Sequence, residues 1–107
     1  MIALALLLLG TCEYKLGHTY ITIAPIGTES AAVQLTTQPG CPWSLKEEFP
    51  WIKITSPKSG SGPARITYSV SPNPGRTSKT AYLDGFPGSQ PAAEPAFRLM
   101  VIVFGRE

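Results

Sequence analysis

Short apolar runs cut by proline and glycine are the feature that most constrains how this chain can fold. The 107 residues include 11 Pro and 10 Gly, and both residue types interrupt regular structure and form turns. Inside the runs, apolar and polar residues alternate with a period of two, which places alternate side chains on one face of a strand. Beyond the first eleven residues, no segment shows the 3.6-residue period of an amphipathic helix. The pattern therefore predicts an all-β protein.

Six or seven short strands follow from the alternating segments and the turn signals between them. That spacing is typical of a sandwich or a barrel. The predicted strands are 12–16, 19–24, 31–36, 50–55, 65–71 and 77–84, with 97–104 as a late run that fits an edge strand, a replacement last strand or an unrelated end. The residues expected to share one core are Val33, Leu35, Ile52, Ile54, Ile66 and Val70.

Residues 1–11 form a signal-like hydrophobic leader, with an unbroken apolar run from Ile2 to Leu9. The run is shorter than the roughly 20 residues that span a bilayer as a helix. It resembles the centre of a secretory signal, although no Lys or Arg precedes it. Two alternatives remain: a lipobox that would acylate Cys12, and an ordinary first strand or buried helix start. We favour export, and so expect a secreted, periplasmic or cell-surface protein.

Cys12 and Cys41 are the only cysteines. With His18, the only histidine, they fall one ligand short of the usual four of a structural zinc site, so we expect no metal. In a small exported domain, two cysteines most often form a disulfide. A lipid on Cys12 would exclude that bond.

The charge pattern and the motifs argue against nucleic acid, cofactors and catalysis. The net charge is only +2 and the basic residues are scattered, so the footprint of a nucleic-acid binder is missing. The segment 60–62 is Gly-Ser-Gly but lacks the rest of a phosphate loop. Glu47 and Glu48 are adjacent, and adjacent strand residues point to opposite faces, so they make a poor catalytic pair. We therefore expect no enzyme, no catalytic residue and no cofactor.

Several short motifs together resemble one known family. They are Cys12-Glu13-Tyr14-Lys15-Leu16, Gly40-Cys41-Pro42-Trp43, Trp51-Ile52-Lys53-Ile54, Gly60-Ser61-Gly62, Ile66-Thr67-Tyr68-Ser69-Val70, Asn73, Arg76-Thr77, Asp84-Gly85-Phe86 and Gln90. In order and spacing they resemble the BACON domain, the Bacteroidetes-associated carbohydrate-binding often N-terminal family.

The resemblance implies an immunoglobulin-like β-sandwich of about seven short antiparallel strands in residues 12–90. Residues 91–107 would then be a Pro-rich linker and a C-terminal apolar strand. Family members are usually exported or surface proteins, often in tandem, which implies a larger multidomain architecture. The chain departs from the family pattern at Pro87, where a last alternating strand is usual and proline removes a ladder donor.

The resemblance also implies a function. The leading hypothesis is a non-catalytic extracellular or cell-surface module for carbohydrate or glycan binding or adhesion, and the alternative is a structural spacer with no ligand of its own. The expected partners are glycans or surface polysaccharide, with a membrane reached only through the leader or a lipid on Cys12. Exposed rings on one sheet face would favour binding, and buried rings under a polar surface would favour the spacer. The candidate ligand-binding residues are Trp43, Tyr20, Tyr82, Ser59 and Asn73, although motif position favours a core role for Trp43.

Overall fold

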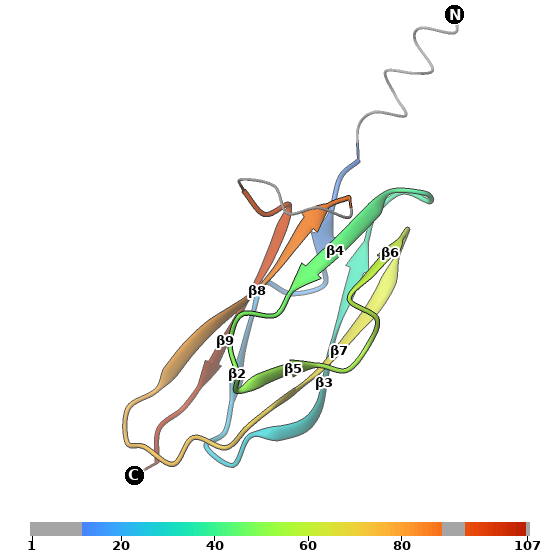
Figure 1. The fold of residues 1–107 in the computed structure, drawn as a ribbon. Helices are drawn as coiled ribbons and strands as arrows, with labels where there is room; N and C mark the ends of the chain where they lie inside the picture. The colour runs from blue at the N-terminus through green and yellow to red at the C-terminus, as the bar shows by residue number, and fades with distance from the viewer. Residues whose placement is uncertain (1–11, 89–93, 107) are drawn as a thin grey trace, which may run out of the picture.

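The computed structural model describes residues 12–88 and 94–106, which form two β-sheets (Figure 1). The predicted leader, 1–11, and most of the predicted linker lie outside the described residues. No helix occurs in the part of the chain that is described. The strands are β1 (Lys15–Leu16), β2 (Tyr20–Ile23), β3 (Thr28–Thr36), β4 (Pro42–Lys46), β5 (Ile52–Ile54), β6 (Ser59–Ser61), β7 (Ala64–Val70), β8 (Lys79–Pro87) and β9 (Phe97–Val103).

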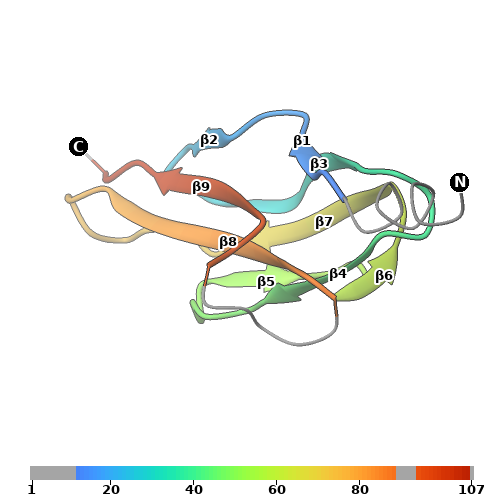
Figure 2. The same ribbon diagram turned by 90° about the horizontal axis from the view of Figure 1, so that it is seen from above.

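One sheet has four strands in the order β1-β3-β7-β5, and the other has five in the order β2-β9-β8-β4-β6. The strands of both sheets run along the same long direction of the molecule (Figure 2). Pairing is antiparallel throughout, except that β2 runs parallel to β9. The chain passes directly from β1 in the first sheet to β2 in the second.

Both sheets contribute inward-facing side chains to one hydrophobic core. The alternating pattern explains this, because one face of each strand is apolar and the other polar. All six core residues expected from the sequence are confirmed as buried, and all six come from the four-stranded sheet. The five-stranded sheet supplies Ile23, Trp43, Ala81, Leu83, Phe97, Leu99, Val101 and Val103.

The strand set differs from the sequence expectation in three respects. The described residues form nine strands in place of about seven, because β4 lies in a stretch assigned to no strand and β6 is a Ser-Gly-Ser segment typical of a loop. The β2–β9 pair is parallel, which a local sequence pattern does not reveal. Residues 97–103 form an inner strand, paired on both sides, so the sheet continues past residue 90.

Gly85 of β8 lets the ring of Phe97 on β9 lie flat against the backbone. The two residues are directly opposite in the register. A Cβ atom added at Gly85 would lie 1.9 Å from Phe97 Cζ, far inside van der Waals contact. Phe97 is buried in the core at this point. The close approach therefore needs a residue without a side chain.

We expect Gly85→Ala to lower the free energy of unfolding by about 1–3 kcal/mol, because the ring must shift out of its packed position. Urea denaturation of the two proteins measures the difference. Gly17→Ala is the matched control, since its added Cβ would lie 3.7 Å from the nearest atom, and its effect should stay within about 0.5 kcal/mol. Equal effects of the two substitutions would contradict this packing.

A disulfide joins Cys12 to Cys41, as the sequence predicts, across a separation of 29 residues. It fixes the segment before β1 to the start of β4. A sulfur in a disulfide cannot carry a thioether lipid, so the acylated Cys12 is not the state seen here. Disulfides persist in oxidising compartments, which indicates an extracytoplasmic location.

Replacing both cysteines by serine should lower the free energy of unfolding by about 3–4 kcal/mol, because the open chain regains loop entropy when unfolded. Chemical denaturation with and without reductant measures this. Reductant should bring the wild type to the level of the double variant and leave the variant unchanged. Two free thiols in the denatured, unreduced secreted protein would contradict the bond.

Candidate functional site

The outer face of the five-stranded sheet carries two tyrosines in one cross-strand row. Tyr20 of β2 and Tyr82 of β8 both lie opposite Met100 of β9. Directly opposed residues point to the same side of a sheet. None of the three belongs to the core cluster or packs against it, and Tyr20 is 60% exposed. We call Tyr20, Met100 and Tyr82 the tyrosine row.

A second row lies beside the first on the same face. Thr22 of β2 and Thr80 of β8 both lie opposite Ile102 of β9. Both threonines are exposed and Ile102 is half-buried. The two rows together form an apolar centre, Met100 and Ile102, flanked by phenol and alcohol hydroxyls. Such a surface can contact a ligand with apolar ring faces and hydroxyl edges.

An ion pair fixes one end of the tyrosine row. Arg98 Nε and Nη2 donate to the two carboxylate oxygens of Asp84 at 2.7 and 3.1 Å. Its guanidinium carbon lies 4.6 Å from the ring centroid of Tyr82, a cation–π contact. Because Asp84 accepts these hydrogen bonds, the pKa of Arg98 is raised above its ordinary value. Tyr82 is therefore held in place by a side chain that is itself anchored, and the Nη1 donors stay outside the ion pair.

The outer face of the four-stranded sheet has a different character. Thr67 of β7 lies opposite Ala32, and its hydroxyl is 2.8 Å from that of Thr55. No aromatic side chain of the described residues occupies this face. The residues that it presents are Lys15, Gln34, Thr36, Lys53, Arg65, Thr67 and Ser69. Aromatic contact area is thus available on one sheet face and not on the other.

Trp43 and Asn73, two of the predicted ligand residues, are structural. Trp43 is 4% exposed, and its indole N–H donates to the Gly62 carbonyl at 2.9 Å. Asn73 is 1% exposed, with its amide donating to the Thr77 carbonyl at 2.9 Å and its side-chain oxygen accepting from the Gly75 N–H at 3.1 Å. Their polar atoms are already used within the fold, so both leave the candidate site.

The remaining predicted residues do not all lie together on the five-stranded sheet. Tyr20 and Tyr82 are brought together in the tyrosine row. Ser59 is exposed on β6, at the opposite edge from β2, and so takes no part in it. Sequence reasoning missed Arg98, Met100 and Ile102. These residues alternate with the buried residues of β9. That alternation could have identified them as outward-facing if the strand had been placed inside the sheet.

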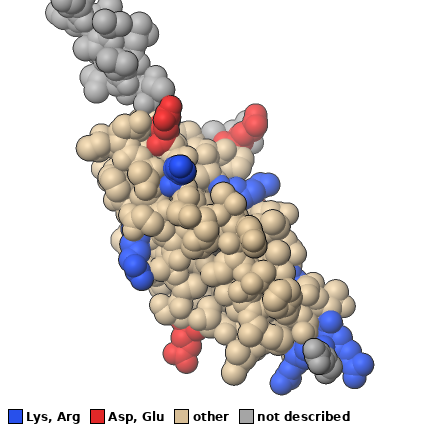
Figure 3. Space-filling view, turned by 180° about the vertical axis from the view of Figure 1, so that it is seen from behind, with Lys and Arg blue, Asp and Glu red and all other residues tan. Residues whose placement is uncertain are grey.

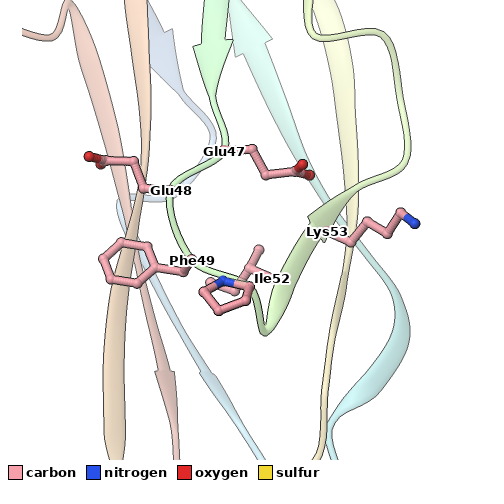
Figure 4. Close-up of a pocket in the computed structure, with 6 residues that line it drawn as sticks. Glu47, Glu48, Phe49, Ile52 and Lys53 are labelled. Atoms are coloured by element: carbon pink, nitrogen blue, oxygen red, sulfur yellow. The ribbon is translucent and has the colours of Figure 1, made fainter.

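Glu47 and Glu48 line an open hollow of about 380 Å³. Their side chains point to opposite sides (Figure 4). Glu47 accepts hydrogen bonds from the Ile54 N–H at 2.8 Å and from Lys58 Nζ at 3.1 Å. These contacts, the Ile54 backbone bond first, lower the pKa of Glu47. Glu48 pairs with Lys46 at 3.3 Å. The two carboxylates are thus engaged separately and do not converge on one substrate.

Charge is dispersed over the described surface. Most of the face in Figure 3 is uncharged, and its basic side chains stand at several separate places. Among residues 12–88 and 94–106, no group of three or more His, Cys, Asp or Glu side chains is placed to hold a metal ion. The same residues include no helix long and apolar enough to cross a membrane.

Comparison with protein-family models and with curated proteins finds no match. Among solved structures, the chain is similar to a Bacteroides ovatus GH5 xyloglucanase in complex with a XXXG heptasaccharide. The TM-score is 0.68 and the identity 14%, over 91% of this chain and 19% of that chain. At this identity the likeness concerns the fold alone. The chain spans about a fifth of the length of the enzyme that it matches.

We expect Glu47→Gln to destabilise the protein at neutral pH and to match the wild type in acid. The folded-state pKa of Glu47 lies below its ordinary value, so its contribution is present above the unfolded pKa and is lost as pH falls through the folded pKa. Denaturation at pH 7 and at pH 3 measures the two differences. Glu48→Gln is the control, because its exposed ion pair contributes little. A gap between Glu47→Gln and wild type that does not narrow as the pH falls would contradict the assignment.

Proposed function

We propose that this chain is a non-catalytic, extracytoplasmic module that binds glycan through the tyrosine row. We further propose that it is a BACON-like domain with the immunoglobulin-like form of the β-sandwich. The motif resemblance, the two sheets around one core and the likeness to part of a carbohydrate-active enzyme support this proposal. The Cys12–Cys41 disulfide supports secretion, the periplasm or the cell surface as the location.

The tyrosine row is the observation that carries the binding proposal. Aromatic rings contact the C–H faces of sugars, and they do so at low entropic cost when already held in place. Tyr20 is exposed, and Tyr82 is fixed by Arg98. Both rings lie on a sheet face that the core does not use. This arrangement suits shallow recognition of a neutral, hydroxyl-rich ligand.

The non-catalytic part of the proposal rests on the arrangement of the acidic side chains. General acid–base work needs two groups within reach of one substrate. Glu47 and Glu48 are directed apart, and Asp84 is engaged by Arg98. Since the likeness covers 19% of the xyloglucanase chain, we propose that this module belongs to a larger architecture. Several copies on one surface would compensate for weak single-site affinity.

The spacer remains a second candidate, favoured by two observations. The outer face of the four-stranded sheet is polar, with Thr, Ser, Gln, Lys and Arg side chains. The described chain also begins at one end of the molecule and finishes at the other (Figure 1). Modules with that geometry can be joined end to end. A spacer would need no ligand at the tyrosine row.

Titration calorimetry with soluble polysaccharides and mucin glycans tests the binding proposal. Wild type should bind at least one of them, and Tyr20→Ala and Tyr82→Ala should each weaken binding about tenfold, the loss of about 1.4 kcal/mol of contact. Ile26→Ala is the control, since Ile26 is 79% exposed but lies outside the row. It should leave affinity unchanged.

Two results would overturn the proposal. Binding that survives both tyrosine substitutions would remove the tyrosine row as the site, and no binding to any glycan would leave the spacer. Sugar release by the purified protein tests the non-catalytic part separately. Turnover that vanishes in Glu47→Gln would show that the module is an enzyme.

A further inference from the structure

We infer that the tyrosine row takes a single, soluble, neutral chain of β-1,4-linked pyranoses, laid across β2, β9 and β8. This inference rests on the proposed glycan-binding function and adds the linkage, the charge and the physical form of the ligand. Three features of the row carry it: the spacing of the strands that bear its tyrosines, the twist of its sheet and the balance of its charges.

The first feature is spacing. Neighbouring strands lie about 4.7–4.9 Å apart, so the backbone positions of Tyr20 and Tyr82, two strands apart, are separated by roughly 9–10 Å. In an extended β-1,4-linked chain, successive rings turn over, and every second ring presents the same face. The disaccharide repeat of such a chain is close to the tyrosine separation. One ring then lies at Tyr20, the next over Met100, and the third at Tyr82.

Other linkages fit this row less well. An α-1,4-linked chain curves into a helix and does not return the same ring face along a straight line. A short branched glycan end reaches one tyrosine but not both. The straight order Tyr20–Met100–Tyr82 therefore selects an extended chain at least three rings long.

The second feature is twist. Adjacent strands rotate by about 20–25°, so β2 and β8 differ in direction by roughly 40–50°. Flat, parallel stacking of both tyrosines on a planar crystal face is therefore disfavoured. A free chain in solution can twist to follow the row. The geometry points to a soluble single chain and away from crystalline cellulose.

The third feature is charge. The charged groups on this face pair with one another: Arg98 with Asp84, and Lys46 with Glu48. Among the described residues of this face, each positive charge is thus paired with a negative one, which does not favour a polyuronic acid. The hydroxyls of Thr22 and Thr80 lie beside the row, where they suit the equatorial hydroxyls of a neutral sugar.

NMR titration of the intact protein with cello-oligosaccharides of increasing length tests the inference. Affinity should rise at least tenfold between cellobiose and cellotriose, when one chain first reaches both tyrosines. In Tyr20→Ala this step should disappear while cellobiose binding is retained at Tyr82. Lys53→Ala, on the opposite sheet face, is the control and should keep the step.

Three further ligands test the linkage, the charge and the physical form of the ligand separately. Maltotetraose, polygalacturonate and crystalline cellulose should each bind at least tenfold more weakly than cellotetraose or not at all. Tyrosine-dependent binding to maltotetraose or to a mucin glycan, without a length step for cello-oligosaccharides, would overturn the inference and leave the proposed function standing. Loss of all tyrosine-dependent glycan binding would remove both.

Discussion

The register of β9 is the constraint on which the rest of the molecule depends. It pairs with β8 over seven residues and with β2 over four. In this register Leu99, Val101 and Val103 point into the core, while Arg98, Met100 and Ile102 point outward. A shift by one residue would exchange the two faces. The same register therefore completes the core and builds the tyrosine row.

The two ends of β9 are secured by different interactions. At its start, Phe97 packs directly on the backbone of Gly85 and lies 5.7 Å from the ring of Tyr14. Tyr14 belongs to the segment that the disulfide ties to β4, and its hydroxyl donates to the Pro42 carbonyl at 2.6 Å. At the far end, the Asn73 amide lies within 3.3 Å of the Phe104 carbonyl. An apolar contact thus holds one end of β9 and a hydrogen bond lies at the other, while the disulfide fixes the segment that carries Tyr14.

The candidate site illustrates why residue type alone misleads. Trp43 is the kind of residue that recognises sugars, yet its ring packs against Gly60, where an added Cβ would lie 2.9 Å from the indole. Burying a large aromatic side chain stabilises the fold more than leaving it in solvent, provided that other side chains can pack against it. Tyr20 stays exposed because β2 is an edge strand and the outer face of its sheet is turned to solvent at this residue. Its position in the sheet, and not its identity, makes it available.

The sequence by itself determined the all-β class, the alternating core residues of β3, β5 and β7, and the cysteine pair. These features depend on local periodicity and composition, which each segment carries alone. Only the tertiary structure decided that β9 lies between β2 and β8, that Trp43 and Asn73 are buried, and that Tyr20 and Tyr82 share a row. Strand order joins segments far apart in the chain: Tyr20 lies opposite Met100, 80 residues further along. Periodicity fixes which way a side chain points but not which strand lies beside it, because pairing is chosen by the packing of the whole core.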